Sequence, residues 1–111
     1  MAFERWDVVA VRFPFIEGDD SKRRPALIVS SSQLHAEQGI CWIVMITTAK
    51  SGPRPGDIAV TDHKSAGLPE QCVIRASRIT AVGTDQIARR IGSITPRNRN
   101  AVAALLKRYM P

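Results

Sequence analysis

The residues best suited to chemistry are cations and hydroxyls at two predicted strand ends. In SKRRPALIVSSS, Arg24 stands directly before Pro25, where an apolar, β-forming run begins. In ICWIVMITT, a continuous apolar run ends in Thr47 and Thr48. If these strands are antiparallel neighbours, Arg24 and Thr47 meet at the same edge of the sheet. Arginine offers charge with two parallel N–H donors and threonine adds a short hydrogen bond, so the pair predicts a phosphate site.

Such a site is suited to RNA cleavage as well as to binding. The 2′-hydroxyl of RNA can attack its own 3′-phosphate, so an enzyme needs only to stabilise the pentavalent phosphorane and help protons on and off. Arginine suits the first task but is a poor general base, because it stays protonated near neutral pH. His35 and His63 offer a competing acid–base pair, although both fall in predicted loops, where a lone histidine is usually only solvated. A threonine at a strand end is also usually just a β-former.

Other site chemistries lack their residues in this chain. There is no GxSxG, no GxxxxGK[ST] and no pair of acids at a suggestive helical spacing. Cys41 and Cys72 do not have the spacing of metal ligands. A disulfide between them is one alternative, but we expect two small buried thiols in a reducing compartment. The histidines have no HExxH-like spacing, so we expect neither a metal nor a cofactor.

The charge of the chain indicates an anionic partner. Its 111 residues carry a net charge of +6, and its 16 basic residues are mostly arginine. Segment 75–108 is strongly basic and holds Asp85 as its only acid. The planar fork of arginine suits bidentate contacts to phosphate or carboxylate, so a nucleic acid or an acidic protein fits. The alternative is a basic surface that only confers solubility.

Length and hydropathy predict one domain over residues 1–111. The apolar fraction of 44% is ordinary for a globular protein. No apolar run approaches the roughly 20 residues that span a bilayer, and MAFERWD does not resemble a signal peptide. We therefore expect a soluble, cytoplasmic protein without a membrane partner.

Short strands and one terminal helix are expected to position these residues. The expected strands cover 6–15, 25–32, 40–48, 57–61, 72–76, 78–83 and 90–94, and residues 72–83 can also form one bent strand. The 40–48 strand should be the most buried, and Pro25 should be the first residue of its strand. Loops are expected at residues 17–24, 49–56 and 62–71. Residues 33–39 are expected to form a loop or one helical turn closed by Gly39. For the first half of 85–94, a helix is an alternative to a strand.

The last sixteen residues before Pro111 have the signals of an amphipathic helix. Thr95 is a good N-cap and Pro96 a good first residue, and Val102, Leu105, Leu106 and Tyr109 fall on one face. Several short strands followed by one helix predict a small barrel or a strongly bent antiparallel sheet, with the helix packed across it.

In these motifs the chain resembles the MazF/PemK-like toxins of bacterial type II toxin–antitoxin systems. The matching pieces run in order WDVVAVRFPF, SKRRPALIVSS, IVMITTAKSG, PGDIAV, GLPEQCVIRASRI, the IGSI segment and the closing helix, and cover nearly the whole chain. The resemblance implies a mainly β fold, a small SH3-like, gyrase-toxin-like antiparallel β-barrel with a C-terminal helix, assembled as a homodimer. It also implies a metal-independent endoribonuclease that cuts single-stranded RNA (mRNA) at short sequences, leaves 2′,3′-cyclic phosphate and 5′-hydroxyl ends, and inhibits translation and growth.

The resemblance also assigns residues and partners. The essential arginine of the family precedes the proline of its RP motif and corresponds to Arg24, and its essential threonine corresponds to Thr47. Further RNA contacts are expected from Lys22, Arg23, Thr48, Lys50 and Arg78. The expected partners are a cognate antitoxin with an acidic, partly disordered segment, single-stranded RNA, and operator DNA bound together with the antitoxin. The general base and the choice between the two threonines stay open.

An alternative on the same fold, and two departures from the family pattern, complete the interpretation. The alternative is a non-catalytic toxin that poisons an enzyme such as gyrase through the end of its terminal helix, here Tyr109 and Met110. Trp6 precedes Asp7 where the family usually has Gly-Asp, so that turn is expected to be built differently. Ala76 or Ser77 stands where an acid is common; if that acid supports the site, activity is weakened or organised differently.

Overall fold

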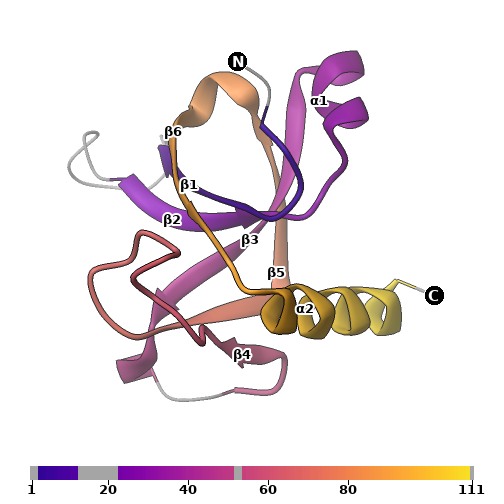
Figure 1. The fold of residues 1–111 in the computed structure, drawn as a ribbon. Helices are drawn as coiled ribbons and strands as arrows, with labels where there is room; N and C mark the ends of the chain where they lie inside the picture. The colour runs from indigo at the N-terminus through magenta and orange to yellow at the C-terminus, as the bar shows by residue number, and fades with distance from the viewer. Residues whose placement is uncertain (1–2, 13–22, 52–53, 111) are drawn as a thin grey trace.

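A single six-stranded antiparallel sheet and a C-terminal helix make up the fold (Figure 1). The computed structural model describes residues 3–12, 23–51 and 54–110. The strand order is β4-β5-β3-β2-β1-β6, so β4 and β6 are the edges. The mainly β prediction is confirmed, in the form of a bent sheet that does not close between β4 and β6. The elements are β1 (Asp7–Arg12), β2 (Arg23–Ile28), α1 (Ser32–Gln38), β3 (Ile40–Thr48), the 3-10 turn η1 (Ala49–Ser51), β4 (Asp57–Ala59), β5 (Cys72–Gly83), the 3-10 turn η2 (Thr84–Gln86), β6 (Ile87–Ser93) and α2 (Pro96–Tyr109).

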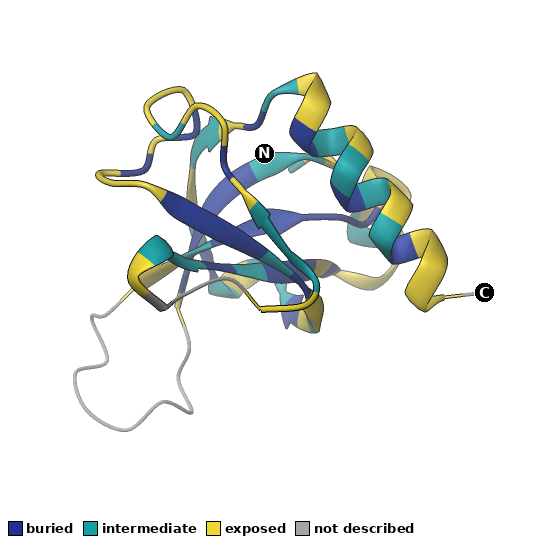
Figure 2. Cartoon of the chain, turned by 90° about the horizontal axis from the view of Figure 1, so that it is seen from below, coloured by how far each residue is buried: buried dark blue, intermediate teal, exposed yellow. Residues whose placement is uncertain are grey.

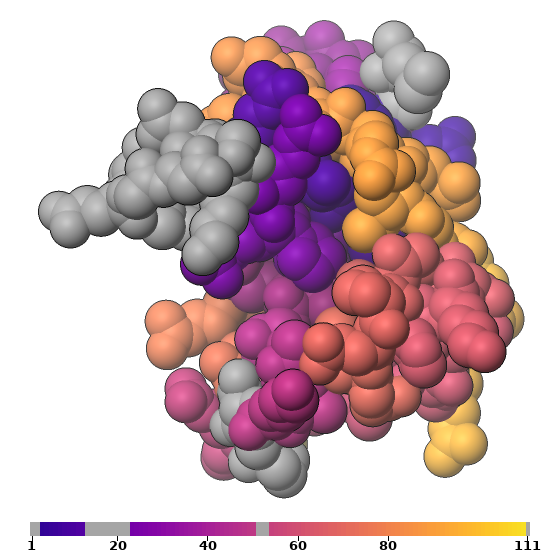
Figure 3. Space-filling model, turned by 90° about the vertical axis from the view of Figure 1, so that its left-hand side faces the viewer, coloured from indigo at the N-terminus to yellow at the C-terminus, as the bar shows by residue number. Residues whose placement is uncertain are grey.

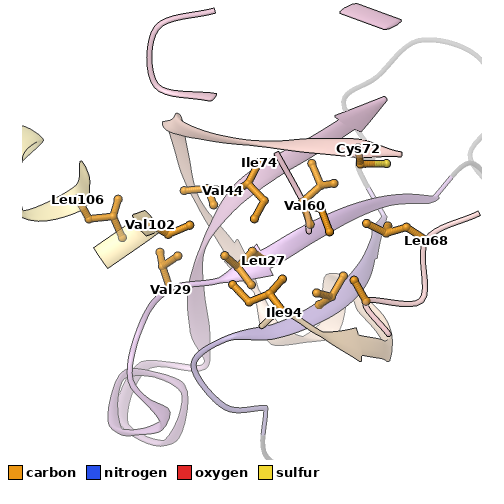
Figure 4. Close-up of a cluster of buried hydrophobic side chains, with 13 residues drawn as sticks. Leu27, Val29, Val44, Val60, Leu68, Cys72, Ile74, Ile94, Val102 and Leu106 are labelled. Atoms are coloured by element: carbon orange, nitrogen blue, oxygen red, sulfur yellow. The ribbon is translucent and has the colours of Figure 1, made fainter. Parts of the chain in front are cut away.

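Both faces of the sheet are apolar, because its strands alternate between two cores. On the α2 side, Leu27 and Val44 pack with Val102 and Leu106 of the helix (Figure 4). Ala26 and Ile43, their chain neighbours, belong to the core on the opposite side. Of the nine residues of β3, Cys41, Ile43, Val44 and Ile46 are buried, and Trp42 is 43% exposed. Strand β1 is buried over a larger fraction of its length, at four of its six residues, so the expectation that 40–48 is the most buried strand is wrong.

Helix α2 begins as the sequence predicts. The Oγ1 atom of Thr95 accepts a hydrogen bond from the backbone N of Asn98 at 3.2 Å, and Pro96 is the first helical residue. Its buried stripe differs from the prediction, because Tyr109 is 45% exposed and Asn98 is buried instead. The Asn98 amide donates to Ala59 O and accepts from Thr61 N, both at 3.0 Å, which fixes the helix to the end of β4. Figure 2 shows the buried side of α2 turned to the sheet.

Two predicted boundaries need correction, and one open alternative is decided. Strand β2 starts at Arg23, so Pro25 is its third residue and not its first. Pro25 pairs with Ala10 of β1. Pairing with β3 begins only at Ala26, because Pro25 has no N–H to donate. Residues 32–38 form the seven-residue helix α1, closed by Gly39 in the left-handed conformation, rather than a loop or a single turn. Residues 72–83 form one strand, interrupted only by an irregularity in its pairing with β3.

The remaining boundaries are close to the prediction. Strand β1 covers 7–12, and the predicted residues 13–15 lie outside the described ranges. Strand β6 begins at Ile87 after η2, which decides against a longer helix in 85–94. Within the described ranges, no helix is long and apolar enough to span a bilayer.

The turn before β1 is built on a strained residue. Trp6 has φ 78°, in the left-handed region that favours glycine, and its N–H donates to Ile28 O at 2.7 Å. Its ring packs against the α2-side core, and the Arg5 guanidinium lies 4.3 Å from the ring centroid. Trp6 therefore adopts the backbone conformation that a glycine would take, and its packing offsets the strain.

Candidate functional site

The pairing of β2, β3 and β5 determines which polar side chains share a face of the sheet. Ala26 lies opposite Met45, and Met45 lies opposite Arg75, so these three residues form one row across the strands. Continuing β2 and β3 by two residues places Arg24 across from Thr47. Residues two apart on a strand point to the same face, so Arg24, Thr47 and Arg75 share that face. Diagonal neighbours of adjacent rows are roughly 7–8 Å apart, within reach of one nucleotide.

These residues surround one cavity of about 500 Å³, which we call the basin. Figure 3 looks onto the side where β2 (purple), the end of β3 (magenta) and the 62–71 loop (salmon) meet around it. Its cationic residues are Arg23, Arg24, Arg75 and Arg78, its hydroxyls are Thr47 and Thr48, and its remaining residues are Pro25, Met45, Ile46, Leu68, Pro69, Glu70 and Cys72. Arg23, Arg24 and Arg78 are exposed, and both threonines are half-buried. The basin is therefore strongly cationic and open to an extended anionic chain.

Arg78 reaches the basin because β5 bulges. Strand β3 advances by one residue from Val44 to Met45, whereas its partner advances by four, from Ile79 to Arg75. The three extra residues have no partner on β3, and bulges of this kind re-aim side chains near functional sites. This bulge also contains Ala76, which is buried, and Ser77, which is exposed; one of them stands where the resemblance leads us to expect an acid.

Arg75 is the one basin cation that pairs with an acid among the described residues. Its Nε lies 3.3 Å from Oδ1 of Asp57, directly across the β4–β5 ladder. The side chains of Arg75 and Asp57 are only 14% and 2% exposed. The Nη2 atom of Arg75 is buried and has no hydrogen-bond partner among the described residues. A buried charged donor without a partner is costly, so this atom is a candidate ligand contact.

The basin contains few groups that can accept a proton. Glu70 is the only carboxylate among the described residues that line it. The pKa of the Cys72 thiol is raised by burial and further by the charge of Glu70, so the thiol stays neutral at neutral pH. Neither histidine lines the basin: the His35 ring packs with Phe3 and its Nδ1 lies 3.7 Å from Cys41 Sγ, while His63 sits half-buried in the 62–71 loop. Within the described ranges, no group of three or more His, Cys, Asp or Glu residues is placed to hold a metal ion.

The loop wall of the basin is held against β6 by close backbone contact. Gly67 has φ +76°, and a Cβ there would overlap the carbonyl oxygen of Ile91. The preceding turn is tied by Asp62, whose carboxylate accepts bonds from the N–H and hydroxyl of Ser65; these bonds lower its pKa. Leu68 then enters the α2-side core beside Cys72 (Figure 4). This packing sets the position of Pro69 and Glu70.

The structure gathers most, but not all, of the predicted site residues. Arg23, Arg24, Thr47, Thr48 and Arg78 line the basin. Lys50 is exposed in η1 and is not among the lining residues, and Lys22 lies outside the described residues. Sequence reasoning missed Arg75 and Glu70. Arg75 had a usable signal, because a cation between Ile74 and Ala76 in an apolar strand requires a partner or a function.

Comparison with known proteins agrees with this arrangement. A family model described as PemK-like, MazF-like toxin of type II toxin–antitoxin system matches residues 4–110. No curated protein sequence matches the chain. Among solved structures, a mycobacterial endoribonuclease in complex with its cognate antitoxin has 22% identity and a TM-score of 0.71, over 95% of this chain and 89% of that one.

Two further solved structures show the same fold. The Mycobacterium tuberculosis toxin MazF-mt6 has 17% identity and a TM-score of 0.70, over 88% of this chain and 89% of that one. A MazE–MazF structure from Deinococcus radiodurans has 15% identity and a TM-score of 0.72, over 96% of each chain. At these identities the likeness establishes the fold and leaves the chemistry to the residues of the basin.

Proposed function

The chain belongs to the family of PemK-like, MazF-like toxins of type II toxin–antitoxin systems, and from that premise we propose that its basin cleaves single-stranded RNA. The observation that carries the proposal is the row geometry: Arg24, Thr47 and Arg75 share one face, inside a cavity with two further arginines. Relatives of the same fold include a mycobacterial endoribonuclease and MazF toxins. A solvated, purely structural edge would not require this concentration of guanidinium groups around two hydroxyls.

The proposed reaction uses the nucleophile of the substrate. The 2′-oxygen attacks the adjacent phosphorus, its proton passes to a base, and the 5′-oxygen leaves and takes up a proton. The products are a 2′,3′-cyclic phosphate and a 5′-hydroxyl. Arg24 stabilises the phosphorane, whose charge exceeds that of the ground state, and Thr47 donates a hydrogen bond to a phosphate oxygen. Arg23 and Arg78 bind flanking phosphates, and Thr48 lies beside them. No step requires a metal ion.

The same basin is suited to an antitoxin. An acidic peptide segment carries the charge that the basin arginines bind in RNA, so a bound antitoxin would exclude the substrate. Solved relatives include complexes of a toxin with its antitoxin. We therefore propose inhibition by direct competition in the cytoplasm, with operator DNA as a further partner of the toxin–antitoxin complex.

We also propose a homodimer, assembled through an uncharged face next to the basin. Trp42 and Ile79 lie on one side of the sheet and are 43% and 41% exposed, and Met110 at the end of α2 is 51% exposed. Together with Thr80 and Ala81, these three residues line a cavity of about 200 Å³, and none of the five described lining residues is charged. Two copies of a chain with a net charge of +6 can meet here without opposing like charges. Arg78 of the basin is the chain neighbour of Ile79, so the interface would border the site.

The cleavage proposal is tested by incubating purified protein with a long single-stranded RNA in EDTA. We expect discrete fragments with cyclic phosphate ends, and no cleavage by Arg24→Ala at an unchanged melting temperature. Arg89→Ala is the matched control, since it removes an exposed arginine of β6 outside the basin. Full cleavage activity of Arg24→Ala would contradict the proposed role of Arg24 in stabilising the phosphorane.

The exposed end of α2 supports one alternative. Tyr109 is 45% exposed at the last helical position, as a protein-poisoning toxin of this fold would require. Intact RNA after incubation with the wild-type protein, together with inhibition of a purified enzyme such as gyrase, would favour this alternative.

A further inference from the structure

We propose that Asp57 is a positioning residue of the basin, which acts through Arg75 and does not itself touch RNA. The inference rests on the proposed RNA site. Asp57 lies at the start of the edge strand β4, opposite Arg75 in the ladder. It is not a lining residue of the basin, whereas Arg75 is.

The carboxylate of Asp57 is fixed at both oxygens. Oδ1 accepts from Nε of Arg75 at 3.3 Å, and Oδ2 accepts from the backbone N of Arg54 at 2.9 Å. Because the Nε edge of the guanidinium faces Asp57, the outer end of the group is not needed for this pair. The carboxylate therefore limits the rotation of Arg75 and holds it in the row next to Arg24 and Thr47.

A purely structural pair is expected to leave no buried nitrogen without a hydrogen-bond partner. The Nη2 atom of Arg75 is buried and unpartnered in the described part of the chain. A phosphate oxygen in the basin would supply the missing acceptor. The ion pair alone is weak evidence for a stabilising role, because apolar residues of similar volume often replace such pairs without loss. Retention of a largely buried cation whose Nη2 has no partner among the described residues, on the wall of an anion site, points to a ligand.

A second pair with the same geometry serves as a control. Asp7 accepts from Nε of Arg90 at 2.8 Å and from the backbone N three residues before it, that of Glu4, at 3.0 Å. Asp57 has the same two contacts, and Arg54 also precedes it by three residues. The Asp7–Arg90 pair lies between β1 and β6, where Arg90 is 52% exposed and neither residue lines the basin. Removing either acid breaks an equivalent set of bonds, but only Asp57 is connected to the site.

The experiment compares Asp57→Ala, Arg75→Met, the double variant, Asp57→Asn and Asp7→Ala. We measure kcat and KM for cleavage of a defined RNA, affinity for an uncleavable 2′-O-methyl oligonucleotide, and melting temperature. Methionine retains most of the side-chain volume of arginine. The double variant leaves no unpaired buried charge, so it allows the test even if a single variant unfolds.

We expect Asp57→Ala and Arg75→Met each to lose about tenfold to a hundredfold in kcat/KM, the range of one hydrogen bond to a charged group. The double variant should lose no more than Arg75→Met alone, because Asp57 acts only through Arg75. Asp57→Asn should recover most of the activity, since its amide oxygen still accepts from Nε. Asp7→Ala should stay within twofold of wild type, although its melting temperature falls.

Two results would overturn the inference while the proposed function stands. One is cleavage within twofold of wild type by folded Asp57→Ala and Arg75→Met when Arg24→Ala is inactive. The other is losses that multiply in the double variant. If the wild-type protein binds the oligonucleotide but does not cleave RNA, the proposed function fails. The affinities of the Asp57 and Arg75 variants for the oligonucleotide then decide whether Asp57 positions Arg75. If it does neither, both are wrong.

Discussion

The basin predicts a specific salt dependence for RNA binding. Three of its arginines, Arg23, Arg24 and Arg78, are exposed, whereas Arg75 is held by Asp57. Each exposed arginine that neutralises a phosphate releases a counterion when RNA binds. For single strands each such contact changes the slope of log K against log salt by about −0.7.

Three contacts therefore give a slope of about −2.1, which lowers affinity about 18-fold between about 50 and 200 mM salt. Arg23→Ala leaves two contacts and a slope of about −1.4, so its affinity should fall only about 7-fold over the same range. Arg24→Lys retains the charge and should keep the wild-type slope. It should nevertheless lose cleavage, because an ammonium cannot make two parallel hydrogen bonds to one phosphate.

The assay is fluorescence anisotropy with a labelled 2′-O-methyl oligonucleotide, whose blocked 2′-oxygen prevents cleavage during titration. Arg89→Ala is again the control, and its slope should equal that of wild type. The reasoning is wrong if Arg23→Ala has the wild-type slope, or if Arg89→Ala changes the slope as much as a basin variant does.

Four further predictions test the surroundings of the basin. Gly67→Ala places a Cβ against a carbonyl oxygen of β6 and should destabilise the fold by at least about 1–3 kcal/mol in chemical denaturation; an unchanged midpoint contradicts this. Glu70→Gln removes the one carboxylate that the described residues bring to the basin and should lower KM for RNA; a fall in kcat instead would identify Glu70 as the general base. Ile79→Lys should yield monomers in analytical ultracentrifugation, and a persistent dimer would exclude the proposed face. Burial raises the pKa of Cys41 and Cys72, so iodoacetamide at pH 8 should modify the thiols of the native protein far more slowly than those of the unfolded protein. Because the unfolded chain ionises these thiols first, the free energy of unfolding should decrease above about pH 8.5.

The start of α2 and the positions of Arg24 and Thr47 near strand ends could be predicted from local sequence patterns. Thr95 and Pro96 define a helix start by hydrogen bonding and φ alone, and α2 begins there. The meeting of Arg24 and Thr47 needed only that two neighbouring strands pair antiparallel and that each residue lie at a strand end. The strand ends can be read from residue types, because an apolar run ends where polar residues begin, whereas the antiparallel pairing of β2 with β3 was a condition of the prediction that the structure supplies.

Long-range pairing was not accessible in the same way. The bulge in β5 depends on how its residues align with β3, and an apolar run does not encode that alignment. Trp6 violates the local rule for a left-handed residue, and only tertiary packing explains it. The partner of Arg75 is 18 residues away on an edge strand, so its pairing with Asp57 could not be deduced from the spacing.

The division of the basin between strands and loop has a consequence for function. The residues proposed to bind phosphate lie on β2, β3 and β5, and all but Arg78, which lies in the bulge of β5, pair with a neighbouring strand. The residues that border them, Pro69 and Glu70, lie in a loop whose position depends on Gly67 and the packing of Leu68. Phosphate is common to every nucleotide, so under the proposed function the strand residues would not distinguish sequences, and we expect the loop to contact bases. The proposal therefore assigns chemistry and sequence preference to separate elements, so that the loop could vary while the phosphate site is retained.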